Sequence, residues 1–103
     1  MRLSIIIPTW NEARYLGRTL DSLQGVEAEI LCVDGGSRDD TMGLAHSFGV
    51  NVLSSPRGRG MQLMRGAHAA SGDILWFLHA DTVVSGDAVT QIRDACARPG
   101  VAG

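Results

Sequence analysis

The sequence predicts an α/β fold in which helices cover both faces of a parallel sheet. Short apolar runs alternate with longer segments whose apolar residues recur at helical spacing, in four strand–helix units. Regular alternation of this kind is typical of parallel sheets joined by crossover helices. A length of 103 residues corresponds to one small domain or part of one, and a hydrophobic share of 45% is that of a globular chain.

The first unit opens with a near-continuous apolar run at residues 3–7, which predicts a buried strand. Asn11 is a candidate cap for the helix that follows. Leu16, Leu20 and Leu23 recur at i, i+4 and i+7, so we expect them to form the buried face of that helix.

The second unit repeats this order. Residues 30–33 predict another buried strand, and Ser37 with Asp40 three residues later resembles a capping box at a helix start. The apolar face of this second helix is expected within residues 44–48.

The third unit has the weakest strand, at residues 50–53. A loop rich in Ser, Pro, Arg and Gly follows at residues 54–60. Met61 and Met64 then lie at helical spacing, and we expect both methionines to pack in the core.

The fourth unit has the strongest strand pattern. Residues 74–78 are apolar at every position, as expected for a central strand buried on both faces. A last helix is predicted over about residues 86–97.

Most of the polar residues that could bind a ligand or take part in catalysis directly follow a predicted strand. Ligands of parallel α/β sheets bind beyond the carboxyl ends of the strands. The segments at those ends are residues 8–12, 34–37, 57–60 and 79–82. Their convergence on one edge is the main functional signal in the sequence.

The composition excludes several classes of function. The formal net charge is −2 and no basic patch dominates, so binding of nucleic acid through its phosphates has no support. No apolar run approaches the roughly 18–20 residues of a membrane span, and the apolar run near the start is too short for a signal peptide. We therefore expect no nucleic-acid partner, no membrane span and a cytoplasmic location.

The absence of lysine narrows the chemistry further, because all nine basic residues are arginine. Schiff-base catalysis on lysine is excluded, as is a Walker-type phosphate loop. No G-x-G-x-x-G follows the first predicted strand, which disfavours a dinucleotide site. An anion would have to be held by arginine, backbone N–H groups, helix N-termini or a metal.

Acidic and basic groups both lie at the predicted edge. Asp34 and Asp81 follow separate strands, and Arg57 and Arg59 lie in the glycine-containing loop. Carboxylates suit a divalent cation, whereas arginine and backbone N–H groups suit phosphate. This mixture favours a nucleoside diphosphate bound together with a metal.

Three motifs carry a resemblance to a known family. They are S-I-I-I-P-T-W-N-E at residues 4–12, I-L-C-V-D-G-G-S-R-D at residues 30–39 and D-I-L-W-F-L-H-A-D at residues 73–81. In order and spacing they resemble the motifs of family-2 nucleotide-sugar glycosyltransferases of the GT-A fold, whose nucleotide-binding half has a Rossmann-like sheet. The Leu-His-Ala-Asp-Thr variant looks like that of one bacterial subgroup.

The resemblance implies a nucleotide-sugar site made of Pro8, Thr9, Glu12, Asp34, Arg57 and Arg59. Asp34 would contact the base or ribose of a UDP- or GDP-linked sugar, and the two arginines would lie near the nucleotide or its diphosphate. Asp81 would bind Mn²⁺ or Mg²⁺, which stabilises the departing diphosphate.

The sequence departs from the family pattern at two positions. Gly35 stands where many relatives have a second aspartate, which leaves the base open between uracil and guanine. His79 stands where the metal-binding D-x-D element has its first aspartate. Two roles remain as alternatives for His79, a structural one and a contact with the metal.

The resemblance covers only the nucleotide-binding half of such an enzyme. We expect residues 1–103 to be that half, with the acceptor site and the general base in a second half. The alternatives are a truncated, non-catalytic nucleotide-binding fragment and a sugar nucleotidyltransferase-like α/β enzyme, although the latter usually needs a lysine. Apolar surface left without the second half predicts self-association.

Overall fold

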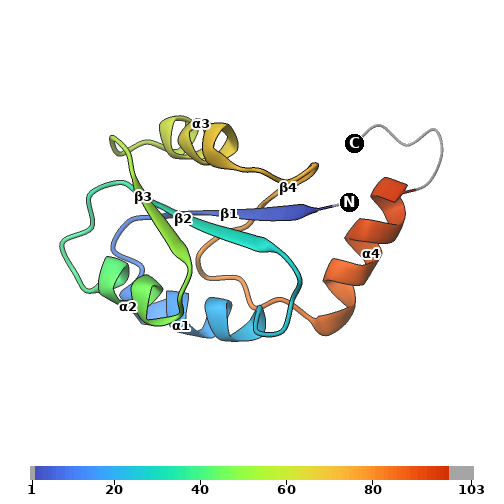
Figure 1. Cartoon of the computed structure of the whole chain (residues 1–103). Coiled ribbons are helices and arrows are strands. Elements are labelled where there is room, and N and C mark those ends of the chain that lie inside the picture. The colour runs from blue at the N-terminus through green and yellow to red at the C-terminus, as the bar shows by residue number, and fades with distance from the viewer. Residues whose placement is uncertain (1, 98–103) are drawn as a thin grey trace.

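The structure is a computed structural model that describes residues 2–97. Over these residues strands and helices alternate along the chain (Figure 1). Their order is β1 (Leu3–Thr9), α1 (Ala13–Ser22), β2 (Glu29–Asp34), α2 (Thr41–Ser47), β3 (Asn51–Ser54), α3 (Arg59–Ala69), β4 (Ile74–Phe77) and α4 (Gly86–Ala97). The predicted order of elements is confirmed.

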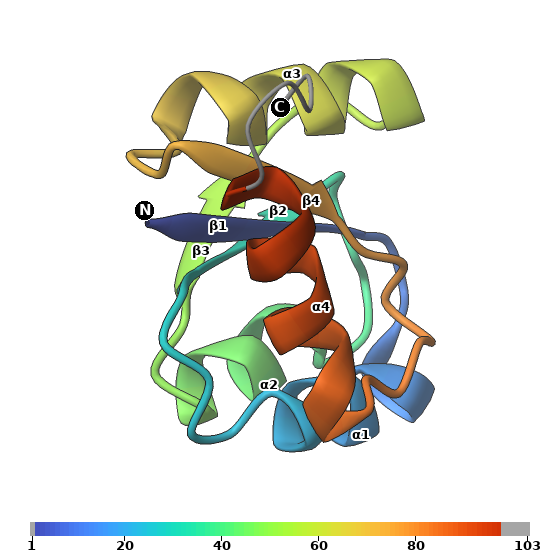
Figure 2. The ribbon, with the colours of Figure 1, turned by 90° about the vertical axis from the view of Figure 1, so that its right-hand side faces the viewer.

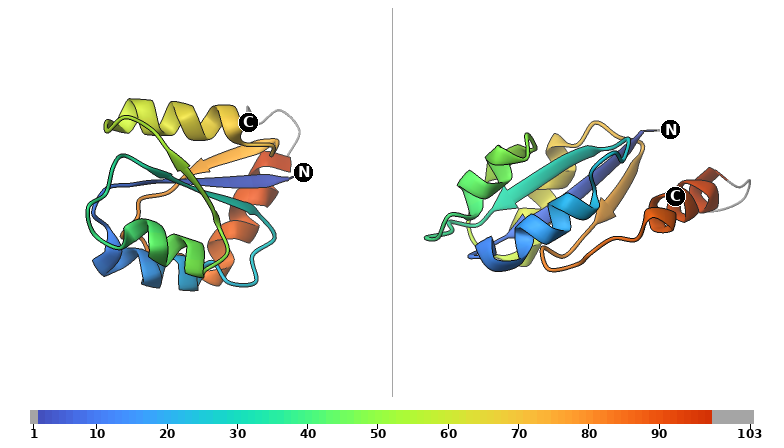
Figure 3. Two further views of the ribbon diagram at one scale, coloured as in Figure 1. Left: turned by 60° about the vertical axis from the view of Figure 1, so that its left-hand side comes forward. Right: turned by 90° about the horizontal axis from the view of Figure 1, so that it is seen from below.

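The strands form one parallel sheet in the order β3-β2-β1-β4. Helices α1 and α2 lie on one face and α3 on the other, so the prediction of helices on both faces is also confirmed (Figure 1). Helix α4 lies beyond the end of the sheet at which β1 begins (Figures 1 and 2). Seen from below, α4 lies away from the carboxyl ends of the strands (Figure 3, right).

The core is divided by the sheet into two parts. Ile5 and Ile7 face α1 and α2, where the leucines of α1 join them, whereas Ile6 faces α3 with Leu31 and Val33. This alternation follows from the two-residue period of a strand. All three isoleucines are fully buried, so β1 is covered on both faces.

The expected central position of the fourth strand is wrong for the described residues. There β4 pairs with β1 alone and forms an edge of the sheet. Leu75 and Phe77 lie on the α3 side and are 40% and 46% exposed, because α3 packs over β1, β2 and β3 instead. A continuous apolar run therefore did not distinguish a central strand from an edge strand.

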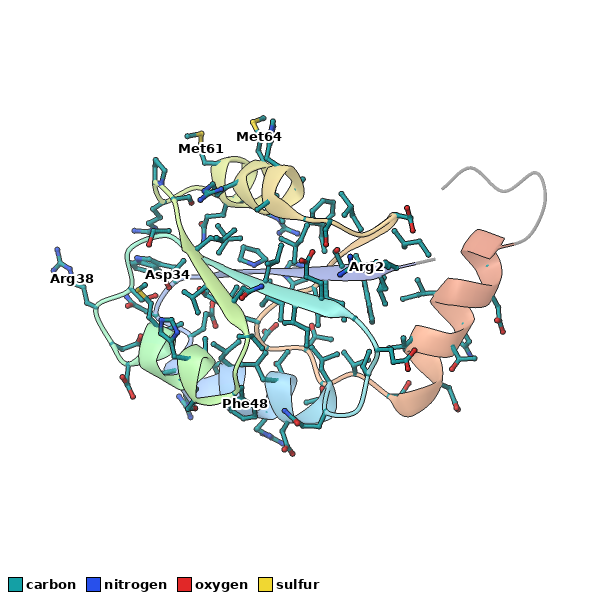
Figure 4. All side chains as sticks on the ribbon, viewed as in Figure 1. Arg2, Asp34, Arg38, Phe48, Met61 and Met64 are labelled. Atoms are coloured by element: carbon teal, nitrogen blue, oxygen red, sulfur yellow. The ribbon has the colours of Figure 1, made fainter. Side chains whose placement is uncertain are left out.

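The expected burial of the two methionines is also wrong. Met61 and Met64 are 53% and 62% exposed, and both point away from the sheet on the outer side of α3 (Figure 4). The helix buries Gln62 and Gly66 instead. These two residues are i and i+4 on one helix face, whereas the methionines lie on the face beside it.

Two predicted helix caps take other roles. Asn11 has a φ of 52° and precedes the first cap residue, Glu12, so its side chain does not cap α1. Ser37 and Asp40 form no capping box, since Ser37 bonds Asp34 and Asp40 makes no side-chain cap hydrogen bond.

Candidate functional site

A cleft of about 200 Å³ opens at the carboxyl end of the sheet. Figure 4 places Asp34 near this end and Arg2 toward the opposite end. The cleft is lined by Pro8, Trp10, Glu12, Arg57, Gly58, Arg59, Gln62 and His79. Four of the residues predicted from the sequence are among them: Pro8 at the end of β1, Glu12 before α1, and Arg57 and Arg59 on the two sides of Gly58.

Asp34 lies beneath the cleft as a buried hydrogen-bond acceptor. Its Oδ1 accepts from the hydroxyls of Thr9 (2.9 Å) and Ser37 (2.6 Å). Its Oδ2 accepts from the backbone N–H groups of Gly36 (3.0 Å) and Ser37 (2.7 Å). A carboxylate has about four lone-pair positions, so internal donors occupy both oxygens.

The protonation of Asp34 reflects these bonds. Burial by itself would raise the pKa of the carboxyl, but the hydrogen bonds from Ser37, Thr9 and Gly36 outweigh it and hold the pKa below its ordinary value. Asp34 is 1% exposed and so is Thr9. Both residues are therefore buried beneath the loop after β2, which Asp34 holds in place, and neither lines the cleft.

The loop after β2 also caps helix α1. The Asp39 carboxylate accepts from the N–H of Ala13 (3.2 Å), and the hydroxyl of Thr41 accepts from the N–H of Glu12 (2.8 Å) and donates to Asp39. These are N–H groups that the start of a helix leaves unpaired. Thr41 at the start of α2 and Asp39 in the loop before it thereby hold the start of α1, including Glu12.

The same two loops are joined a second time through Asn11. Its N–H donates to the Ser37 hydroxyl (2.8 Å), and its Oδ1 accepts from the N–H of Arg38 (2.8 Å). The left-handed backbone of Asn11 turns both groups toward the second loop. The loops after β1 and β2 thus form one bonded unit.

Two arginines face the cleft in different settings. The Arg57 guanidinium lies over the Trp10 ring, 3.5 Å from its centroid. Nη2 of Arg59 lies 3.2 Å from Nε2 of His79. Since a guanidinium only donates, His79 accepts this bond through Nε2 in the tautomer that carries its proton on Nδ1.

The acidic side of the site is formed by Glu12 and Asp81. Partial burial raises the pKa of Glu12 above its ordinary value, and the negative charges of Asp81 and Asp39 raise it further. Asp81 is exposed at the turn after β4. The two carboxyl groups are therefore near enough to interact but are contributed by separate loops.

Helix α1 holds the turn that carries Asp81. The buried hydroxyl of Thr19 donates to the carbonyl of Ala80 (2.7 Å), and the Ser22 hydroxyl accepts from the N–H of Val84 (3.0 Å). Ala80 is itself 5% exposed. Asp81 is thus displayed from a segment anchored on both sides.

The carboxylates of the site would hold Mg²⁺ or Mn²⁺ only together with further oxygen ligands, such as those of substrate phosphates and water. Among the side chains that the structure describes, no group of three from His, Cys, Asp or Glu is arranged to hold a metal ion. Mg²⁺ is commonly held by one or two carboxylates together with substrate phosphates and water. Asp81 suits that mode of binding, and an all-protein cage does not arise from these residues.

Several supporting residues were missed by the sequence analysis. Gln62, Thr19 and Thr41 bond backbone groups of elements far away in the chain. No spacing or composition signal identifies such partners. The helix pattern around Gln62 pointed to the neighbouring methionines instead.

No helix of the described part of the chain is long and apolar enough to cross a membrane.

Comparison with known proteins gives consistent matches. The family model described as "Glycosyl transferase family 2" matches residues 4–103. Dolichol-phosphate mannosyltransferase of Pyrococcus furiosus is 31% identical over 105 residues, which cover 92% of this chain and 30% of that protein.

Two solved structures share the fold. Glucosyl-3-phosphoglycerate synthase of Mycobacterium tuberculosis, in complex with Mn²⁺, UDP and glucosyl-3-phosphoglycerate, has a TM-score of 0.69 and 32% identity, over 77% of this chain and 33% of that one. S. aureus TarS has a TM-score of 0.80 at 24% identity, over 91% of this chain and 32% of that one, and supports the fold alone. The chain spans about a third of the length of the relatives it matches.

Proposed function

The chain belongs to glycosyltransferase family 2, and from that premise we propose that its cleft binds a nucleoside-diphosphate sugar together with Mn²⁺ or Mg²⁺. The sugar would be transferred to an acceptor bound by other parts of a longer protein. The observation that supports this proposal is that two arginines and Glu12 line one strand-end cleft, with Asp81 near enough to Glu12 for its charge to raise the pKa of that carboxyl.

The arginines supply the binding of the diphosphate in this proposal. A guanidinium pairs with phosphate oxygens through well-directed N–H groups and keeps its charge at all relevant pH values. Arg57 and Arg59 lie at the cleft on the two sides of Gly58. With no lysine in the chain, these side chains carry the positive charge of the cleft.

The carboxyl groups supply the metal side. Asp81 would coordinate the cation, and Glu12 would add negative charge beside it. The cation when bound would stabilise the diphosphate as it leaves the sugar. The M. tuberculosis synthase is solved with Mn²⁺ and with Mg²⁺, in both cases with UDP, which favours UDP as the first nucleotide to test.

Pro8 would line the nucleotide site directly, whereas Thr9 and Asp34 would act on it through the loop after β2. Since internal donors occupy both oxygens of Asp34, its proposed influence on the base or ribose is exerted by ordering residues 35–37. The cytoplasmic location expected from the sequence is likewise a proposal, which cell fractionation tests.

Titration calorimetry with UDP-sugar and GDP-sugar, with and without Mn²⁺, tests the function. We expect metal-dependent binding that Asp81→Ala weakens by more than about tenfold, the loss typical even of residues that only support a metal ligand. Asp21→Ala removes an exposed carboxylate at the far end of α1 and is the matched control. Equal affinity in Asp81→Ala contradicts the metal assignment, and no binding by the unmodified chain contradicts the proposed function.

A further inference from the structure

Gln62 is a buried polar side chain that joins three separate pieces of backbone. Its Nε2 donates to the carbonyls of Thr9 and Val33, both at 2.9 Å, and its Oε1 accepts from the N–H of Gly58 at 3.2 Å. The side chain is 5% exposed. An amide has two N–H donors and one carbonyl, and every one of these groups is used.

The hydrogen-bond partners of Gln62 belong to two strand ends and to the loop that carries the cleft arginines. The carbonyls of Thr9 and Val33 lie near the carboxyl ends of β1 and β2, and Gln62, which bonds both of them, lines the cleft. Gly58 lies between the two cleft arginines, and its φ of 147° is in the region that favours glycine. One side chain therefore fastens the arginine-bearing loop to the sheet.

The space around Gln62 depends on the glycine at position 35. A Cβ at Gly35 would lie 3.0 Å from Cδ and Oε1 of Gln62 and 3.1 Å from Cα of Arg57. Gly35 is not among the glycines with positive φ, so its backbone conformation admits other residues. A side chain at position 35 would therefore crowd the Gln62 amide and the Arg57 backbone, and one of these neighbours would have to shift.

We propose that Gln62 is a positioning residue that holds Arg57 and Arg59 at the cleft, and that Gly35 is its required counterpart. Arg57, held next to Gly58, remains stacked on Trp10, and Arg59 remains in reach of His79. The two guanidinium groups are thereby presented to an anion before it binds, which lowers the ordering cost of binding. The effect on nucleotide affinity rests on the proposed function, whereas the effect on the loop does not.

The variant Gln62→Leu tests the positioning role, because leucine keeps an apolar side chain but has no amide. We expect faster hydrogen exchange at the Gly58 amide and a changed Trp10 emission as Arg57 leaves the ring, with the far-UV circular dichroism retained. Trp10→Phe separates the emission of Trp10 from that of the second tryptophan. UDP affinity in the presence of Mn²⁺ should fall by about tenfold, which corresponds to about 1.4 kcal/mol.

Met64→Leu is the matched control, since Met64 is exposed on the same helix and lies outside the cleft lining. It should leave the Gly58 exchange, the Trp10 emission and the UDP affinity unchanged. A Gln62→Leu protein with unchanged Gly58 exchange and Trp10 emission overturns the proposal. A changed loop with unchanged UDP affinity overturns its consequence for binding.

Gly35→Ala gives a second test that retains the glutamine and covers the case in which Gln62→Leu does not fold. The added methyl group should displace the amide and reproduce the faster Gly58 exchange. In a Gln62→Ala background the same substitution should have a smaller effect, because the obstructing side chain is gone. Equal effects in the two backgrounds overturn the pairing of the two positions.

These readouts distinguish the positioning role of Gln62 from the proposed function. If the unmodified chain binds neither UDP nor GDP, the proposed function fails while the Gly58 exchange and the Trp10 emission still decide the role of Gln62. If UDP binds normally and both variants leave the loop unchanged, the positioning role fails and the proposed function stands.

Discussion

Asp34 holds the loop after β2 in place, although it was expected to contact a ligand. The sequence places it at a strand end, and the resemblance implied a contact with the base or ribose. In the structure its oxygens accept bonds from Thr9, Gly36 and Ser37. Two hydroxyl groups and two backbone N–H groups donate to this buried carboxylate. Such charge-assisted bonds stabilise both the loop and the ionised form of Asp34.

Asp34→Asn should therefore destabilise the fold at neutral pH. The amide group would turn an N–H donor toward groups that also donate, which costs about 1–3 kcal/mol for hydrogen bonds of this kind. Urea unfolding monitored by circular dichroism measures the difference. An unchanged free energy of unfolding would contradict the structural role of the carboxylate.

The same substitution should alter the dependence of stability on acid. The folded-state pKa of Asp34 is lowered, so its contribution is present above the unfolded-state pKa of about 3.9 and is lost as the pH falls from there through the folded-state value. Glu29, whose pKa is lowered first by its bond from the Ser71 N–H, titrates in the same direction in both proteins. The difference between the unmodified chain and Asp34→Asn should shrink in this acid range, and a constant difference would count against the assignment.

At the scale of elements, helix α3 packs unusually close to the sheet. A Cβ at Gly66 would lie 2.5 Å from Cγ2 of Ile6 and 3.0 Å from Cγ2 of Val33. The glycine allows the helix backbone to approach β1 and β2, which brings Gln62 within reach of the strand-end carbonyls. The positioning of the cleft loop by Gln62 therefore depends on the close packing of α3 on the sheet.

Gly66→Ala should destabilise the fold by about 1–3 kcal/mol through overpacking, although alanine is the better helix former by about 1 kcal/mol. Gly60→Ala is the control within the same helix, because nothing lies within 4 Å of its added Cβ. That variant should be neutral or slightly stabilising. Thermal or urea unfolding of the two proteins should move in opposite directions, and equal shifts would show that helix propensity, not packing, dominates.

At the scale of the whole molecule, the described residues leave an apolar sheet edge exposed. Leu75 and Phe77 on β4 are 40% and 46% exposed, and Val83 in the following turn is 61% exposed. An edge strand with apolar side chains is a template for pairing with another chain. The self-association predicted from the sequence is located by this observation at β4, and it stays a prediction.

The chain of residues 1–103 should therefore associate as its concentration rises, and Phe77→Lys should reduce the association because it places a charge on the edge. Tyr15→Lys changes an aromatic residue of similar exposure on α1 and is the control. Light scattering over a concentration series measures both. A monomer at every concentration would contradict the prediction, and an equal effect of both substitutions would contradict the role of β4.

The order of elements and the edge that carries the cleft were predictable from the sequence. Strand and helix periods are local, and the carboxyl ends of parallel strands necessarily meet at one edge. For this reason the segments after the strands could be placed at one edge. The family resemblance then implied Pro8, Glu12, Arg57 and Arg59 as members of one site, and all four line the cleft.

Tertiary structure alone decided which side chains meet and which are buried. Whether residues 74–78 form a central or an edge strand depends on neighbours that the run itself does not specify. The face that α3 turns to the sheet brings Gly66 against Ile6 and includes Leu63 and Ala67, whereas the two methionines stay exposed. The bonds of Gln62 and Asp34 join groups distant in the chain, and hydrogen bonds of that kind leave no periodic signal in a sequence.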